Sequence, residues 1–395
     1  MKAVVAMDSF KGSLTSLQAG LAAAEGIRRG YPEAQVVVRP LADGGEGTVE
    51  ALTEGMKGTR QQVTVTGPLG SPVGCEYGIL PPEEKGGKST AVMEMAGAAG
   101  LTLIPEEKRN PLITTTYGVG EMIQDAMEKG CRRFLIGIGG SATNDGGAGM
   151  LQALGFGLLD RAGKQIGPGA TGLAQLCQIT KDGIDPKLRE CEFRIACDVT
   201  NPLCGPLGAS AVFGPQKGAG PKQIREMDGW LARFAELAAQ TCPQADPQAM
   251  GSGAAGGLGF AFRTFLHGVL EPGIEIVLKE TRLEEYAAWA DVVITGEGRL
   301  DGQTAMGKAP AGVAALAKKY GKPVLAFSGS VTPDAGACLA RGIDAYFPII
   351  REITTLQKAM EPAYAQRSLT EAVEQAFRLW RLSEDRGGNK DGKTG

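Results

Sequence analysis

The chain opens with Lys2-Ala3-Val4-Val5-Ala6-Met7, a run of small and branched apolar residues that stops at Asp8. A short apolar run bounded by polar residues is typical of a buried strand. Residues 14–29 then carry apolar side chains at helical spacing, and Gly30-Tyr31-Pro32 ends that pattern. Residues 34–39 have the composition of a second strand. The start of the chain therefore predicts a β-α-β unit, in which helices cover a parallel sheet.

The C-terminal part of the chain repeats this alternation. Residues 291–295 and 323–328 predict strands, and residues 309–320 predict a helix between them. The middle of the chain differs, because short strand-like pieces separated by Pro-Gly turns come before its helices. The pattern indicates an α/β protein in which the first domain is interrupted by a second one.

The expected boundaries follow from these patterns. We predict a discontinuous first domain of residues 1–57 and 290–382, and an inserted α/β domain of residues 58–289. Two domains in tandem are the alternative. Residues 383–395 are polar and glycine-rich without periodicity, so we expect a disordered tail there.

The composition excludes several classes of function. A net charge of −3 argues against a general nucleic-acid or membrane-surface binder. The chain has one histidine, His267, which disfavours His-activated hydrolases and His-ligated metal sites. Its eight cysteines form no CxxC pair, so reduced thiols and a cytoplasmic location are expected. Any chemistry must then depend on carboxylates, Lys, Arg, backbone amides and metal ions.

Four loops combine glycine with acidic and amide residues and carry few bulky side chains. Glycine lets backbone N–H groups surround an anion, and carboxylates suit a cation or a proton in transfer. Ordinary turn chemistry is the alternative for any one loop, but four of them together favour a site for a phosphorylated ligand with a metal. The four loops span residues 42–47, 137–147, 251–257 and 295–302.

Two acidic residues follow predicted strands directly. Asp8 ends the first strand, and Asp198 ends the apolar segment Phe193-Arg194-Ile195-Ala196-Cys197. Ligands of open α/β sheets bind outside the carboxyl ends of the strands, so each is a candidate base or metal ligand. Lys11 follows at the start of the predicted helix, where it suits an acidic substrate or a phosphate in transfer.

The loop at 137–147 matches the dinucleotide fingerprint only loosely, so an NAD-dependent oxidoreductase remains a weak alternative. Its hydroxyl and amide side chains suit hydrogen bonds to phosphates or sugar, while Asp145 could instead cap a helix. A second glycine motif, Gly302 to Lys308, lacks the hydroxyl residue that a Walker A motif requires, because Ala309 stands there.

Seven motifs in chain order resemble the bacterial glycerate kinases of type I. The resemblance covers residues 1 to about 380, with only the tail after Ser383 outside it. The motifs are MDSFKGSL, LADGGEGT, GIGGSATNDGGAG, ACDVTNPLCGPLGA, FGPQKGA, GSGAAGGLG and ITGEGRLDGQTAMGKAP.

The resemblance implies an ATP-dependent kinase that uses Mg²⁺ and phosphorylates D-glycerate to 2-phosphoglycerate or 3-phosphoglycerate. It also implies a flavodoxin-like three-layer domain formed by both chain ends, with a second α/β domain inserted. Phosphoryl transfer needs positioning, cations and a carboxylate but no histidine, in agreement with the composition. The alternatives are a kinase of another short hydroxy acid and a non-catalytic nucleotide or carboxylate sensor.

We assign the candidate residues by their chemistry. Asp198 is our candidate base, with Lys11 and Asp8 as further catalytic residues. The substrate would contact Ser9, Asp43, Gly44, Gly45, Arg299 and Asp301. The nucleotide would contact Gly139, Gly140, Ser141, Thr143, Asn144 and Asp145, and Mg²⁺ would bind Asp43 and Glu297. We expect a monomer or homodimer with a small-molecule substrate and neither nucleic acid nor membrane as a partner.

Overall fold

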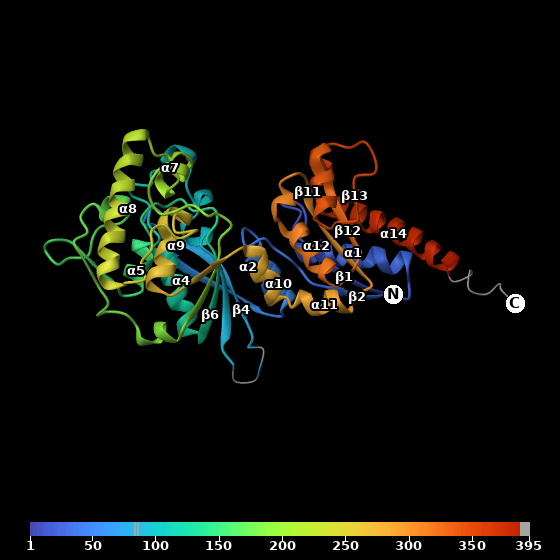
Figure 1. Ribbon diagram of the computed structural model, residues 1–395, viewed down its shortest axis with the longest axis horizontal. Coiled ribbons are helices and arrows are strands. Elements are labelled where there is room, and N and C mark those ends of the chain that lie inside the picture. The colour runs from blue at the N-terminus through green and yellow to red at the C-terminus, as the bar shows by residue number, and fades with distance from the viewer. Residues whose placement is uncertain (83, 85–86, 388–395) are drawn as a thin grey trace. The chain divides into compact units, whose positions relative to one another are not determined.

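The computed structural model describes residues 1–82, 84 and 87–387, and it places β1 (Lys2–Met7) inside a five-stranded sheet. The strand order is β13-β12-β11-β1-β2, and every neighbouring pair is parallel (Figure 1). Numbered within this sheet, the order is 2-1-3-4-5, that of the flavodoxin-like fold. The other strands are β2 (Gln35–Val38), β11 (Val292–Leu300), β12 (Val324–Val331) and β13 (Ala345–Pro348).

Helices cover both faces of this sheet. The apolar residues of β1 alternate between faces, and Ala3, Val5 and Met7 belong to one core with α1 and α14. Two glycines let these helices approach closely: a Cβ at Gly26 would lie 2.4 Å from the Thr370 carbonyl oxygen, and one at Gly30 would lie 2.6 Å from that of Glu374. The helices are α1 (Ser16–Gly30), α2 (Thr48–Gly55), α10 (Gly273–Glu280), α11 (Leu283–Trp289), α12 (Ala309–Lys319), α13 (Leu356–Met360) and α14 (Pro362–Gly387).

A second, six-stranded sheet has the order β10-β9-β6-β5-β4-β3. Its β10, β9, β6 and β5 are parallel, and β4 and β3 extend it as an antiparallel hairpin. The strands are β3 (Thr59–Thr66), β4 (Pro72–Leu80), β5 (Ser89–Glu94), β6 (Cys131–Gly137), β9 (Glu192–Ala196) and β10 (Val269–Glu271), with β7 (Gly157–Leu159) and β8 (Gln178–Thr180) as a separate pair.

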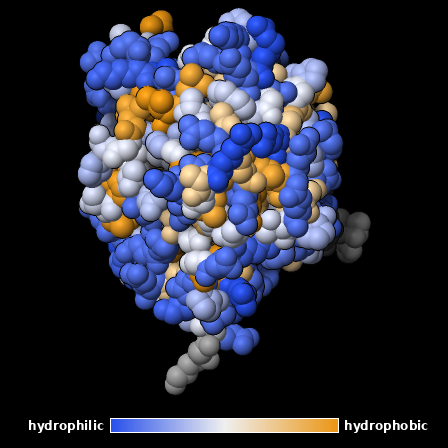
Figure 2. Space-filling model, turned by 90° about the vertical axis from the view of Figure 1, so that its left-hand side faces the viewer, coloured by the Kyte–Doolittle hydropathy of each residue, from blue (hydrophilic) through white to orange (hydrophobic). Residues whose placement is uncertain are grey.

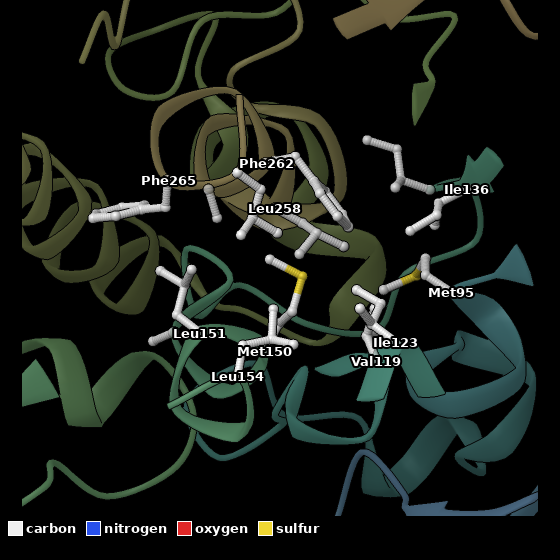
Figure 3. Close-up of a cluster of buried hydrophobic side chains, with 14 of the residues drawn as sticks. Met95, Val119, Ile123, Ile136, Met150, Leu151, Leu154, Leu258, Phe262 and Phe265 are labelled. Carbon is white, nitrogen blue, oxygen red and sulfur yellow. The ribbon is translucent and has the colours of Figure 1, made fainter. Parts of the chain in front are cut away.

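The core of this second region fixes the segment that follows β6. Met150, Leu151 and Leu154 of α5 point into a cluster shared with α4 and α9 (Figure 3). This packing places the loop between β6 and α5 on a rigid base. The helices are α3 (Ala96–Ala99), α4 (Tyr117–Glu128), α5 (Ala148–Ala153), α6 (Ala170–Leu173), α7 (Ala209–Phe213), α8 (Pro221–Thr241) and α9 (Ala254–Phe265).

The chain divides into two units. Unit 1 contains residues 1–43, 50–56 and 277–395, and unit 2 contains residues 44–49 and 57–276. The expected fold class, a three-layer α/β domain from both chain ends with an inserted α/β domain, is confirmed. The return to unit 1 comes at Val277 rather than at residue 290, because α10 and α11 precede β11.

Two other expectations were wrong in part. The strand expected at 291–295 continues to Leu300, because Gly296 and Gly298, which suggested a loop, lie inside β11. A Cβ at Gly296 would lie 1.9 Å from the Phe327 carbonyl oxygen, so close strand packing requires this glycine. Of the expected tail, residues 383–387 continue α14, and residues 388–395 lie outside the described part of the chain.

The surface agrees with the composition. Figure 2 shows a largely hydrophilic face, on which apolar residues form several separate areas. Every helix in the described residues is too short or too polar to cross a membrane. The eight cysteines are free thiols.

Candidate functional site

The carboxyl ends of β1 and β11 bring two acidic residues together in unit 1. The strand order reverses between these neighbours, and such a switch point is where flavodoxin-like sheets bind ligands. Asp8 follows β1 directly, and its backbone N–H donates to the Gly296 carbonyl at 2.9 Å. Glu297 is the next residue of β11. Both side chains are buried, with 6% and 8% of their residue surface exposed.

Burial and repulsion govern the charge state of Asp8. Burial, followed by the negative charges of Asp43 and Glu297, raises the pKa of Asp8 to about 7. The Ser9 backbone N–H, which donates to Asp8 Oδ1 at 2.7 Å, and the positive charge of Lys11 act in the opposite direction. Asp8 is therefore a buried carboxyl group poised to exchange a proton near neutral pH.

Glu297 shares this environment. Burial raises the pKa of Glu297, and Asp301 and Asp43 add to the increase. The Thr304 hydroxyl donates to Glu297 Oε1 at 2.5 Å, and the hydroxyl and the Lys308 charge both lower its pKa. Asp8, Asp43 and Glu297 form one electrostatically coupled group, which we call the acidic cluster.

Basic residues lie beside the acidic cluster. Lys11 is exposed, and its electrostatic effect on Asp8 confirms that the two are close. Arg299 is largely exposed and lies 3.6 Å from Asp301. Asp301 also accepts the backbone N–H groups of Gln303 and Thr304, so it holds the turn after β11. Lys308 contributes a positive charge near Glu297.

The described residues include no group of three or more His, Cys, Asp or Glu side chains arranged to hold a metal ion. Mg²⁺ needs fewer protein ligands than such a group provides, because it usually binds one or two carboxylates and completes its shell with water and substrate phosphates. Asp43 and Glu297 offer that number of carboxylates. Their unfavourable electrostatic coupling is the environment that a divalent cation would relieve.

In unit 2, the loop after β6 presents backbone rather than side chains. Gly139 and Gly140 are exposed, and a Cβ at Gly139 would meet no atom within 4 Å. Ser141, next in the chain, reaches the surface with 6% of its area. Bare amides followed by a hydroxyl form a surface that suits phosphate oxygens.

The remaining residues of this loop point inward. Thr143, Asn144 and Asp145 have no exposed surface. Asp145 accepts the backbone N–H and the hydroxyl of Thr116, each at 2.8 Å, and also the N–H groups of Gly147 and Gly149. Asn144 Nδ2 donates to the Ser210 hydroxyl at 2.9 Å. The side chains of Asn144 and Asp145 therefore hold the loop from inside, and the exposed residues of the loop are the glycines at its start.

A buried lysine, which the sequence assignment missed, lies beneath the loop. Lys217 is 1% exposed, and its Nζ donates to the Ser141 hydroxyl oxygen at 2.9 Å and to the Thr143 carbonyl at 2.6 Å. Burial lowers the pKa of Lys217 to about 7, and the negative charge of Asp145 partly offsets this effect. Lysine is rarely buried without a partner, and only its motif FGPQKGA could have drawn attention to it.

Asp198 also lies in unit 2, after β9, but its environment differs from that of Asp8. The residue is exposed, and its Oδ1 accepts the Gly273 N–H at 3.1 Å, at the start of α10. This contact stabilises the carboxylate at a helix N-terminus.

Gly44 lies beside this region, and its φ is +88°. A Cβ there would lie 2.6 Å from Gly273 Cα and 2.7 Å from Ala196 Cβ, so Gly44 has a packing role. Gly45 is half-buried, and its carbonyl accepts the Thr48 hydroxyl at 2.7 Å.

Comparisons with known proteins agree on one family. The model of the glycerate kinase family matches residues 3–381. The chain is 49% identical to glycerate 2-kinase of Escherichia coli over 364 residues, which cover 92% of this chain and 94% of that one. It is 48% identical to glycerate kinase of Bacillus subtilis over 370 residues, covering 93% and 96%. A crystal structure of a candidate glycerate kinase 2 from Salmonella typhimurium matches with a TM-score of 0.89 and 45% identity, over 98% of this chain and 99% of that one.

Proposed function

The chain belongs to the glycerate kinase family, and we propose that it transfers the terminal phosphate of ATP to the 2-hydroxyl group of D-glycerate. Similarity along nearly the whole chain to relatives named glycerate kinase supports the reaction. The name of the Escherichia coli relative, glycerate 2-kinase, favours 2-phosphoglycerate over 3-phosphoglycerate as the product.

One observation carries the chemical assignment: the acidic cluster, in which Asp8 and Glu297 are buried, lies at the switch point of the unit 1 sheet. A hydroxyl group must lose its proton as the phosphoryl group arrives, and a positioned carboxylate can accept it. The position of Asp8 directly after β1, an interior strand of the sheet, fixes its backbone, and burial limits the access of water to the carboxyl group.

We assign the proton acceptor to Asp8 rather than to Asp198, the candidate favoured on the sequence alone. Asp8 is buried in a position where a carboxyl group can gain and lose a proton near pH 7. Asp198 is exposed and accepts the Gly273 N–H, which suits a residue that stabilises the start of α10.

The charged residues around the acidic cluster supply the other roles. Asp43 and Glu297 would hold Mg²⁺, which supplies positive charge to the phosphate groups during transfer. Lys11 and Arg299 would bind the glycerate carboxylate, with help from the hydroxyl group of Ser9. Asp301 would contribute by positioning Arg299, from which it lies 3.6 Å away. Gly44 and Gly45 are retained only as backbone contacts, since neither has a side chain to offer.

The loop after β6 would bind the phosphates of ATP through Gly139, Gly140 and Ser141. The exposure of Gly139 and Gly140 and the absence of any bulky side chain support this role. Thr143, Asn144 and Asp145 would act indirectly, by holding the loop from inside. Free thiols and a requirement for ATP favour the cytoplasm as the location.

The test is a reaction of the purified protein with ATP, Mg²⁺ and D-glycerate, with the product identified by ³¹P NMR. We expect 2-phosphoglycerate and one equivalent of ADP. The same assay with L-glycerate, lactate and glycolate distinguishes a kinase of another hydroxy acid. ATP binding without transfer to any of these acids would favour a sensor and overturn the proposal.

A further inference from the structure

The hydrogen bonds of Lys217 fix the direction of the Ser141 hydroxyl. In its protonated form Lys217 can only donate, so Ser141 Oγ accepts in the 2.9 Å contact with Lys217 Nζ. A serine hydroxyl has one proton of its own, and that proton is then available to another acceptor. Within the described residues, Ser141 donates it to no protein group.

The surroundings of Ser141 determine where that proton can go. The inner side is closed by Lys217 and the backbone carbonyl of Thr143, both buried. The preceding residues, Gly139 and Gly140, are exposed and carry no side chain. Ser141 follows them directly and retains 6% of its residue surface, so the ligand that we infer for this hydroxyl would lie over the two glycines.

Burial of a lysine must be compensated, and the compensation here is local. Two of the three Nζ protons are bound to groups of the loop, and the Asp145 carboxylate stabilises the ammonium charge electrostatically. Lys217 comes from η4 (Pro215–Lys217), about seventy residues further along the chain, so it connects the loop to a separate segment. Such a buried, charge-assisted contact fixes geometry more firmly than a neutral one.

We propose that Lys217 is a positioning residue that makes the Ser141 hydroxyl a donor to the nucleotide phosphates. The inference rests on the proposed function, since it deepens the role of the loop after β6. Lys217 does not contact the nucleotide in this arrangement. It orients the one side chain of the exposed loop segment that can donate a hydrogen bond to a phosphate oxygen.

The experiment measures ATP affinity by calorimetry, without glycerate, for Ser141→Ala, Lys217→Met and the double variant. We expect each single change to weaken binding about tenfold, in the range for a hydrogen bond to a charged group. The double variant should bind ATP with the same affinity as the single variant that binds it more weakly, because both changes remove the same contact. Ser141→Thr, which keeps the hydroxyl, should bind ATP like the wild type.

Lys222→Met is the matched control, since Lys222 is an exposed lysine on α8, five residues further along the chain. It should leave ATP affinity unchanged. Steady-state kinetics provide a second measurement: the KM for ATP should rise in Ser141→Ala while the KM for glycerate stays constant. A structural defect would instead lower kcat or the melting temperature without this separation.

The inference would be overturned if Ser141→Ala bound ATP within twofold of the wild-type affinity. It would also be overturned if the double variant lost about a hundredfold in ATP affinity, the product of two independent tenfold losses. If Lys217→Met does not fold, the contrast between Ser141→Ala and Ser141→Thr decides. If the wild type phosphorylates glycerate and Ser141→Ala binds ATP as tightly as the wild type, only this inference is rejected. Wild-type protein that binds ATP through Ser141 but does not phosphorylate glycerate would reject only the proposed function.

Discussion

Replacing Asp8 by asparagine should stabilise the protein at pH 8 in buffer containing EDTA. A buried carboxyl group whose pKa rises from 3.8 to about 7 favours the protonated form in the folded state. Folding stability from this group is then fully present below pH 3.8 and is lost as the pH rises through 7. Asparagine stays neutral throughout, and its side-chain oxygen can still accept the Ser9 N–H.

The pKa change sets the magnitude. At about 1.4 kcal/mol per pKa unit, the shift of Asp8 corresponds to about 4 kcal/mol above pH 7. Relaxation of the site will reduce this value, so we expect a gain in the free energy of unfolding of at least ~2 kcal/mol at pH 8. The gain should shrink steadily toward pH 4.

The assay is urea unfolding of the wild type and Asp8→Asn at several pH values between 4.5 and 8.5. Hydrogen exchange of peptides from β1 and β11 would report on unit 1 separately, because a two-unit protein need not unfold in one step. Glu54→Gln is the control, since Glu54 is an exposed acid of the same unit. A gain that does not change with pH, or a loss of stability at pH 8, would refute the electrostatic account of Asp8.

Four further outcomes are expected. Asp8→Asn should lower kcat at least a hundredfold while Asp198→Asn has a smaller effect; the reverse order in steady-state assays would return the base to Asp198. Lys11→Ala should lower kcat/KM for glycerate at least tenfold, about 1.4 kcal/mol, and unchanged kinetics would remove Lys11 from the site. Adding Mg²⁺ should reduce the stability gain of Asp8→Asn, because the cation compensates the same repulsion; an equal gain with and without Mg²⁺ would argue against a metal site here. Gly44→Ala should lower the melting temperature of unit 2, since its Cβ would meet Gly273 at 2.6 Å and φ is +88°, whereas an unchanged melting curve would show that the loop moves freely.

The sequence predicted the fold where hydrophobic periodicity was clear. The apolar run before Asp8 is β1, and the alternating pattern of residues 291–328 gives β11, α12 and β12. Prediction failed where one residue type is typical of two different structures, as glycine is of loops and of closely packed strands. Gly296 looked like part of a loop, although it lies in a strand that needs a residue without a side chain.

The candidate site was predictable only in part, for a similar reason. The position of Asp8 after a strand was readable, but its burial beside Asp43 and Glu297 depends on a strand almost three hundred residues away. Asn144 and Asp145 have the chemistry of ligand-binding residues, yet their side chains make hydrogen bonds in the interior. Lys217 lies in the motif FGPQKGA, but the motif does not show that the lysine is buried, since lysine is almost always exposed.

The position of β1 between β2 and β11 has a consequence for synthesis on the ribosome. Its partner β11 leaves the ribosome about 290 residues after it, a delay of roughly 15–60 s at 5–20 residues per second. During that time β2 is the only neighbouring strand available to β1, and the face of α1 around Gly26 and Gly30 has no α14 to pack against. Unit 2 leaves the ribosome in the same interval and can fold while β1 still lacks its partner β11. The N-terminal segment is therefore the part of the nascent chain that most needs protection by a chaperone.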